Sequence, residues 1–108
     1  MTATMTNQVI PGFSGEVEQF VAEHGITEAI FSIYEVTQRL FRQSKQVRVE
    51  LYADHEDSSW VSVFFVIEGW PLNSAQTGSI DEAWFRETHP LIPADWFWRI
   101  GHQIEWRE

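Results

Sequence analysis

The stretch VRVELYADHEDSSWVSVFFVIE, residues 47–68, decides the fold. In its first part Val47, Val49 and Leu51 alternate with polar residues, which is the pattern of a β-strand with one buried face. Residues 53–59 are mostly polar and acidic, as in a loop. Residues 60–68 are mostly apolar at both odd and even positions. They therefore predict a second strand that lies in the centre of a sheet and is covered on both faces.

The alternation of side chains limits how these two strands can pair. An antiparallel hairpin with Leu51 opposite Val61 keeps the apolar residues of the first strand on one face. In that register Tyr52 lies opposite Trp60 beside the loop, and such aromatic pairs are favourable. A slip by one residue would turn Arg48 toward the core. We therefore expect this register to be well specified.

The residues before this stretch show helical periodicity. Ser14 is a candidate N-cap for a first helix, and Gly25 is a natural stop. From the N-cap candidate Thr27 to about residue 43, apolar residues recur at the spacing of one helix face. The sequence therefore predicts two helices joined at a glycine.

The last third of the chain combines a short helix with a strand. Residues 69–78 predict a long loop, after which Ser79 and Glu82 have the spacing of a capping box. Pro90 should end this third helix, because the residue before a proline avoids helical geometry. A brief helical turn is expected from Pro93 to Trp98. Residues 100–107 alternate again and predict a third strand.

These elements predict an α+β fold in the order α-α-β-β-α-β, with an N-terminal helical hairpin packed on a small three-stranded antiparallel sheet. We expect residues 1–12 to form a flexible N-terminal tail and residues 13–108 to form a single α+β domain. Trp60, Phe64 and Val66 would then lie on the face opposite the helical hairpin. The third helix or a second copy of the chain would have to cover them.

Composition narrows the class of protein. Seven Lys and Arg against sixteen Asp and Glu give a net charge of −9, so a broad nucleic-acid surface is not expected, because phosphate is repelled. The absence of cysteine excludes a disulfide or a thiolate metal site within the chain. No secretory signal or membrane-length apolar run is visible, and the expectation is a cytoplasmic protein, of a bacterial kind, without a membrane partner.

Motifs of enzyme chemistry are missing from the sequence. It has no nucleophile elbow, P-loop or dinucleotide fingerprint. The four histidines, at positions 24, 55, 89 and 102, are distributed over different elements. Residues Asp54–Asp57 could supply ligands to a hard cation, but consecutive residues in a short loop rarely converge on one ion. We therefore predict no catalytic residue, no cofactor and no specific metal site.

Part of the helical region resembles a DNA-binding helix-turn-helix. The resemblance covers about twenty residues and rests on apolar residues and a turn glycine at the spacings of that motif: Phe20, Gly25, Ile26, Phe31 and Tyr34. The second helix carries Glu28 and Glu35 and no basic residue before Arg39, whereas contacts to DNA need Arg, Lys, Asn or Gln there. A DNA-binding regulator is therefore the third functional hypothesis.

Most of the basic residues are concentrated in one segment. Arg39, Arg42, Lys45 and Arg48 are four of the seven. They could contact an anion or a partner protein. The alternative is a solvated helix end, where cations complement the helix dipole.

Aromatic residues are the most unusual feature, with six Trp and eight Phe in 108 residues. Aromatic side chains contribute to cores, protein interfaces and ligand pockets. The residues predicted to form an interface are Trp60, Phe64, Val66, Trp84, Trp96, Trp98 and Trp106.

These observations favour a small, acidic, non-enzymatic protein-interaction module, homodimeric, that could neutralise a basic partner protein. The alternative is a small-ligand binder or minor enzyme with an aromatic pocket between the sheet and the third helix.

Overall fold

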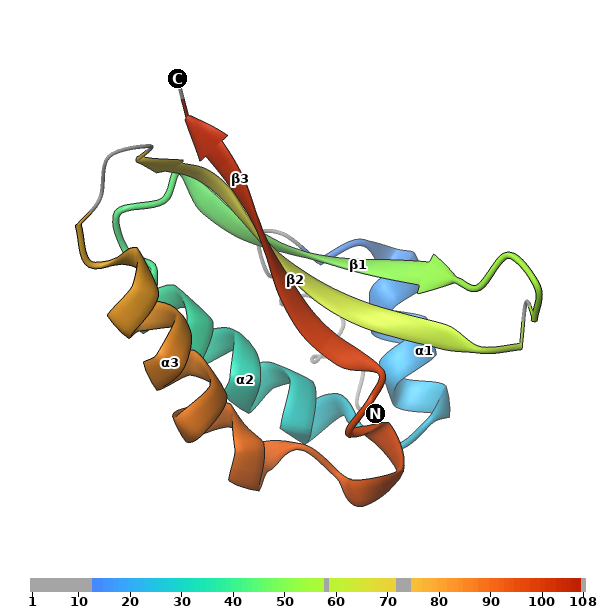
Figure 1. The fold of residues 1–108 in the computed structure, drawn as a ribbon. Helices are drawn as coiled ribbons and strands as arrows, with labels where there is room; N and C mark the ends of the chain where they lie inside the picture. Colours follow the sequence, from blue (N-terminus) through green and yellow to red (C-terminus); the bar gives the residue numbers. More distant parts are fainter. Residues whose placement is uncertain (1–12, 58, 72–74, 108) are drawn as a thin grey trace, which may run out of the picture.

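The computed structural model describes residues 13–57, 59–71 and 75–107. These residues form three α-helices and three β-strands around one core (Figure 1). In chain order the elements are α1 (Gly15–Glu23), α2 (Thr27–Leu40), β1 (Gln46–Ala53), β2 (Val61–Pro71), α3 (Thr77–Thr88) and β3 (Ile100–Arg107). Two short 3₁₀ helices, His89–Leu91 and Ala94–Trp96, link α3 to β3. The predicted α+β class and order of elements are confirmed.

The sheet is mixed, so the prediction of a purely antiparallel sheet is wrong. The strand order is β1-β2-β3, with β1 antiparallel and β3 parallel to the central β2. The cause is the connection between β2 and β3. Helix α3 and the two 3₁₀ helices bring the chain back along the sheet, so β3 starts at the same end as β2 (Figure 1). Parallel neighbours require a long crossover of this kind.

The register of the β1–β2 hairpin differs by two residues from the predicted one. Leu51 lies opposite Val63 rather than Val61, and Tyr52 lies opposite Ser62 rather than Trp60. A shift by two residues keeps every side chain on its predicted face, so alternation alone cannot distinguish the two registers. Tyr52 instead packs edge-on against the ring of Phe64, with ring centroids 5.2 Å apart.

Strand β2 continues three residues beyond its predicted end at Glu68. The prediction of a loop over 69–78 is therefore wrong at its start, and residues 72–74 lie outside the described residues. Gly69 makes this extension possible at an irregularity in the β2–β3 register. Its φ is +72°, and a Cβ there would lie 2.9 Å from the Cβ of Lys45. Beyond the glycine, Trp70 turns inward, is fully buried and packs against Phe41.

The helix ends are confirmed in part. The Ser14 side chain caps α1 by accepting a hydrogen bond from the Val17 N–H, and the chain turns at Gly25, whose φ is +67°. Helix α2 starts as predicted, although Thr27 is its first residue and not its cap. The capping box of α3 does not form. The helix starts two residues before Ser79, whose hydroxyl donates to the Gln76 carbonyl instead.

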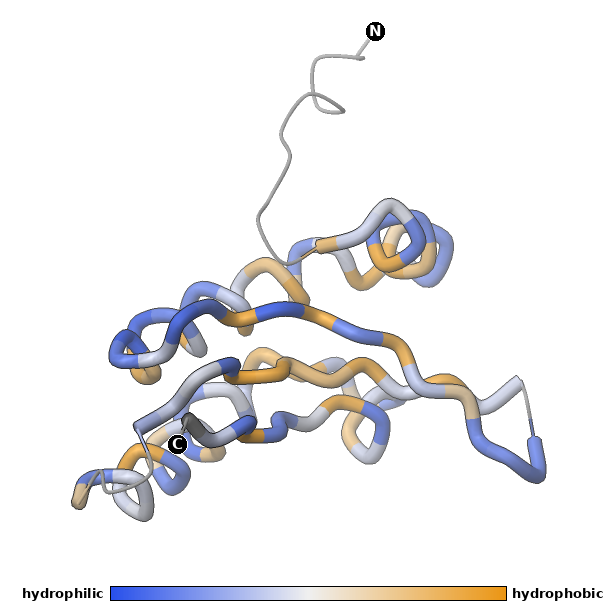
Figure 2. Tube along the Cα trace, turned by 90° about the horizontal axis from the view of Figure 1, so that it is seen from above, coloured by the Kyte–Doolittle hydropathy of each residue, from blue (hydrophilic) through white to orange (hydrophobic). Residues whose placement is uncertain are grey.

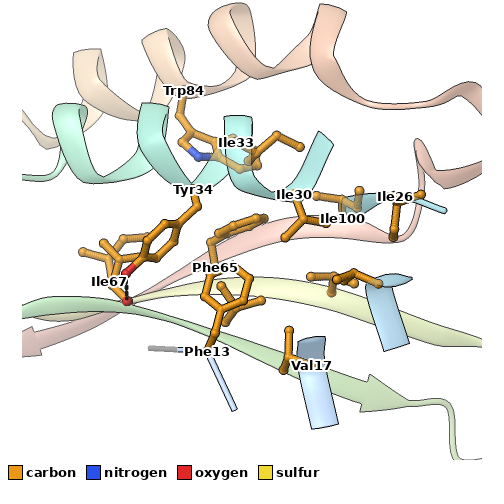
Figure 3. Packing of buried hydrophobic residues seen from close by; sticks show 14 of the residues in the cluster. Phe13, Val17, Ile26, Ile30, Ile33, Tyr34, Phe65, Ile67, Trp84 and Ile100 are labelled. Carbon is orange, nitrogen blue, oxygen red and sulfur yellow. Dashed lines mark hydrogen bonds between the residues drawn. The ribbon is translucent and has the colours of Figure 1, made fainter. Parts of the chain in front are cut away.

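All three helices of the described chain pack on the same side of the sheet. Helices α2 and α3 lie side by side beneath it (Figure 1). Along β1 hydrophobic and hydrophilic residues alternate, whereas β2 is almost continuously hydrophobic (Figure 2). In the core, Phe65 of β2, Tyr34 of α2 and Trp84 of α3 converge (Figure 3). The other side of the sheet, which we call the open face, is covered by none of these helices.

Candidate functional site: the open face of the sheet

The open face combines charged and aromatic side chains. Alternation along β1 and β2 places residues 48, 50 and 52 and residues 62, 64, 66 and 68 on this face. On β3 their neighbours are Gly101, Gln103 and Glu105. The half around Arg48 is charged, and the half around Phe64 is aromatic.

An ion-pair network joins the three strands in the charged half. The Arg48 guanidinium donates to Glu50 at 2.5 Å, to Glu68 at 2.7 Å and to Glu105 at 2.8 Å. Glu50 also accepts a hydrogen bond from the Tyr52 hydroxyl at 2.7 Å. Because Arg48, together with Lys45 at 3.9 Å from Glu68, meets three carboxylates, this half of the face carries a net negative charge.

Hydrogen bonds within the network shift the pKa values of Arg48, Glu50 and Glu68. Hydrogen bonds to Glu105 and Glu50 raise the pKa of Arg48. The pKa of Glu50 is lowered, chiefly by its hydrogen bond from Arg48 and then by the one from Tyr52. The pKa of Glu68 is lowered by hydrogen bonds from Gln46 and Arg48. Glu50 and Glu68 therefore remain charged at neutral pH.

Val66 lies between the two halves and is fully buried although no described helix covers it. Its neighbours across the strands are Arg48 on β1 and Gln103 on β3. Long side chains of this kind shield apolar neighbours with their aliphatic stems while their polar ends stay in water. Val66 thus needs no partner protein to be buried.

The aromatic half is more exposed. Tyr52 and Trp60 keep 42% and 44% of their surface accessible. Phe64 lies over Gly101, where a Cβ would come within 3.0 Å of the Phe64 ring. The guanidinium of Arg99 lies between the rings of Trp60 and Trp96, 4.7 and 4.1 Å from their centroids. This cation–π contact holds Trp60 next to the start of β2.

The seven residues predicted to form an interface do not form one surface. Trp84 and Trp96 are buried in the core of the single chain, at 1% and 6% exposure. Trp98 and Trp106 are exposed but belong to the two ends of β3. Trp60 and Phe64 remain on the open face, as the alternation predicts.

Carboxylates neutralise three of the four basic residues predicted to bind an anion or a partner. Arg39 pairs with Glu87 of α3. Lys45 lies 3.9 Å from Glu68, and Arg48 is the centre of the network described above. Arg42 is exposed and forms no ion pair with any described residue.

A mostly apolar cleft of about 370 Å³ lies between α3 and the start of β3. We call it the α3–β3 cleft. Its walls include Trp84, Phe85, Thr88, Phe97, Trp98 and Ile100. Phe85 and Trp98 are 60% and 84% exposed, which is unusual for such large apolar side chains. A cleft therefore exists where the alternative hypothesis places an aromatic pocket.

His102 is a buried polar residue that sequence reasoning did not single out. Its side chain is 8% exposed, and Nε2 lies 2.8 Å from Oδ1 of Asp81 on α3. Nδ1 is buried and has no hydrogen-bond partner among the described residues. The ring packs against Trp84 at 4.3 Å and Phe85 at 5.4 Å. None of the described hydrogen bonds joins His102 to a nucleophile. Asp81 and His102 therefore do not belong to a catalytic triad among the described residues.

The other predicted features lie apart from the open face. In the acidic loop, Asp54 accepts hydrogen bonds from the backbone N–H groups of Glu56 and Asp57. Within the described residues, no group of three or more His, Asp or Glu side chains is arranged to hold a metal ion. On α2, the helix that the DNA-binding hypothesis would place in the groove, Glu28 and Glu35 are exposed.

Comparisons with protein-family models, with curated proteins and with solved structures found no match to this chain. No helix in the described ranges is both long and apolar enough to cross a membrane.

Proposed function

We propose that this chain is a non-enzymatic protein-interaction module that binds a basic partner protein on the open face of its sheet. The observation that carries the proposal is the arrangement of three carboxylates from three strands, Glu50, Glu68 and Glu105, beside exposed aromatic rings. We call the surface formed by these carboxylates with Tyr52, Trp60 and Phe64 the acidic–aromatic face.

Charge complementarity is the reason for choosing a basic partner. The chain carries −9, and long-range attraction of this kind accelerates the association of oppositely charged proteins. The carboxylates would orient the basic side chains of the partner. Tyr52 and Trp60 would supply apolar contact area, because aromatic residues dominate the energetics of protein interfaces.

A pair of synthetic peptides tests the proposal. One peptide alternates Arg with Leu and Tyr, and its matched control has Glu in place of every Arg. We expect the basic peptide alone to bind, with an affinity that falls as salt increases. Amide chemical shifts in β1, β2 and β3 should change on binding.

The double variant Tyr52→Ser with Trp60→Ser should weaken this binding about tenfold or more. Phe85→Ser is the matched control, because it removes an exposed ring from α3, away from the open face. Equal binding of both peptides, no binding of either, or binding that the double variant leaves unchanged would each refute the proposal.

A further inference from the structure

Strand β3 is an edge of the sheet, and the direction of its free peptide groups follows from one hydrogen bond. The Val63 N–H donates to the Arg99 carbonyl at 2.7 Å, and Val63 lies opposite Ile100. Because peptide groups alternate in direction along a strand, those of Gly101 and Gln103 also point toward β2. The N–H and C=O groups of Ile100, His102 and Ile104 therefore point away from the sheet, where no described strand pairs with them.

The first five residues of β3 lack the features that usually protect an edge strand from pairing, and its charged residues, Glu105 and Arg107, lie at its end. Residues 100–104 contain no Lys, Arg, Asp, Glu or Pro. The opposite edge is β1, where the charged residues Arg48 and Glu50 alternate with apolar residues. Helix α1 also packs against this strand. The two edges are thus unequal, and β3 is the one open to another strand.

Exposed tryptophans lie at both ends of β3. Trp98 precedes the strand and forms one wall of the α3–β3 cleft. Trp106 near the end of the strand is 48% exposed. It lies opposite Trp70, which is buried on the helix side of the sheet, so Trp106 also points to the helix side. The cleft lies on this side as well, since α3 forms its other wall.

We propose that β3 pairs antiparallel with β3 of a second copy about a two-fold axis at His102, and that Trp106 of each copy enters the α3–β3 cleft of the other. In this register Ile100 lies opposite Ile104 of the second copy. The start of one strand meets the end of the other, which brings each Trp106 beside the partner copy's Trp98. A two-fold axis perpendicular to the sheet keeps all helices on one side, so both Trp106 side chains point toward a cleft.

A second copy fits this edge better than a foreign strand for two reasons. It provides a tryptophan at the position that antiparallel pairing places next to the cleft. Although both chains are acidic, the pairing also brings no carboxylates together at its centre, because the segment from Ile100 to Ile104 carries none. The dimer would leave both acidic–aromatic faces free on one six-stranded sheet. It is therefore independent of the proposed function.

Sedimentation equilibrium of the full chain tests this proposal. We expect a species of twice the 12.6 kDa chain mass at about 100 μM. Trp106→Ala should weaken the dimer about tenfold or more, whereas Arg42→Ala, which removes an exposed side chain outside β3, should leave it unchanged.

Proline substitution tests the strand pairing itself. Ile104→Pro removes an N–H that points away from β2, and Ile104→Ala removes the same side chain while keeping that N–H. We expect the proline variant to be monomeric under conditions in which the alanine variant is still dimeric, with circular dichroism verifying that both are folded. A wild-type monomer, or a dimer that Trp106→Ala does not weaken, would overturn the proposal. Filling of the cleft by the apolar dye anilinonaphthalene sulfonate in the wild-type chain at dimer concentrations would also overturn it.

Discussion

The two faces of this sheet bury the same central strand by different chemistry. On the helix side, Phe65 and Ile67 of β2 are covered by apolar side chains of α2 and α3. On the open side, Val66 is buried just as completely between two long polar side chains, Arg48 and Gln103. A strand that is apolar on both faces therefore does not require a second layer of helices.

This difference changes the interpretation of the apolar residues on the open face. Trp60, Phe64 and Val66 suggest from sequence a large patch that must be covered. In the structure Val66 is already shielded, Phe64 packs on Tyr52 and Gly101, and Trp60 stacks on Arg99. What remains exposed is a small group of rings beside carboxylates, the surface that we propose binds a basic partner.

The largest expected effect comes from the helix side. Trp84→Ala removes a fully buried indole and should lower the free energy of unfolding by about 3–5 kcal/mol. Trp60→Ala on the open side should cost much less, because its ring is nearly half exposed. Urea denaturation of both variants measures the difference. Similar losses would show that the two faces contribute equally to stability.

A buried hydrogen bond on the helix side should give the next largest effect. The Thr37 hydroxyl accepts from Nε1 of Trp84 at 2.8 Å and donates to the Ile33 carbonyl at 2.6 Å. Thr37→Val leaves the indole N–H buried without a partner, which should cost about 1–3 kcal/mol. Thr88→Val is the control, because the Thr88 hydroxyl donates to a backbone carbonyl of its own helix. A larger loss for Thr88→Val in urea denaturation would contradict this assignment.

The smallest effect is expected for Arg48→Met on the open side, because partly exposed ion pairs contribute little to stability. Its signature is pH dependence. The folded-state pKa values of Glu50 and Glu68 are lowered, so their contribution is present above the ordinary glutamate pKa of 4.5 and is lost as pH falls through the lowered values. The stability difference between wild type and Arg48→Met should therefore shrink from pH 7 to pH 3 in urea denaturation. A constant difference would mean that Arg48 acts only by packing over Val66.

Several features of this protein can be derived from local patterns. The helical spacing before residue 41, the alternation of residues 47–52 and 100–107, and the stop signals at Gly25 and Pro90 all correspond to observed elements. These patterns reflect interactions over a few residues, such as capping and one-sided burial, which do not depend on the rest of the fold. The face of the sheet on which each strand residue lies is predictable for the same reason.

Other features depend on contacts between residues far apart in sequence. The direction of β3 follows from the crossover through α3. The register of the β1–β2 hairpin follows from contacts in the turn and between the strands, because alternation alone allows two registers that differ by two residues. The Asp81–His102 pair joins residues 21 positions apart, and the Arg48 network joins three strands. No local sequence pattern indicates that these residues come into contact. They arise when the sheet forms and the helices pack against it, because only then do the partners of each charge and each buried polar group come within reach.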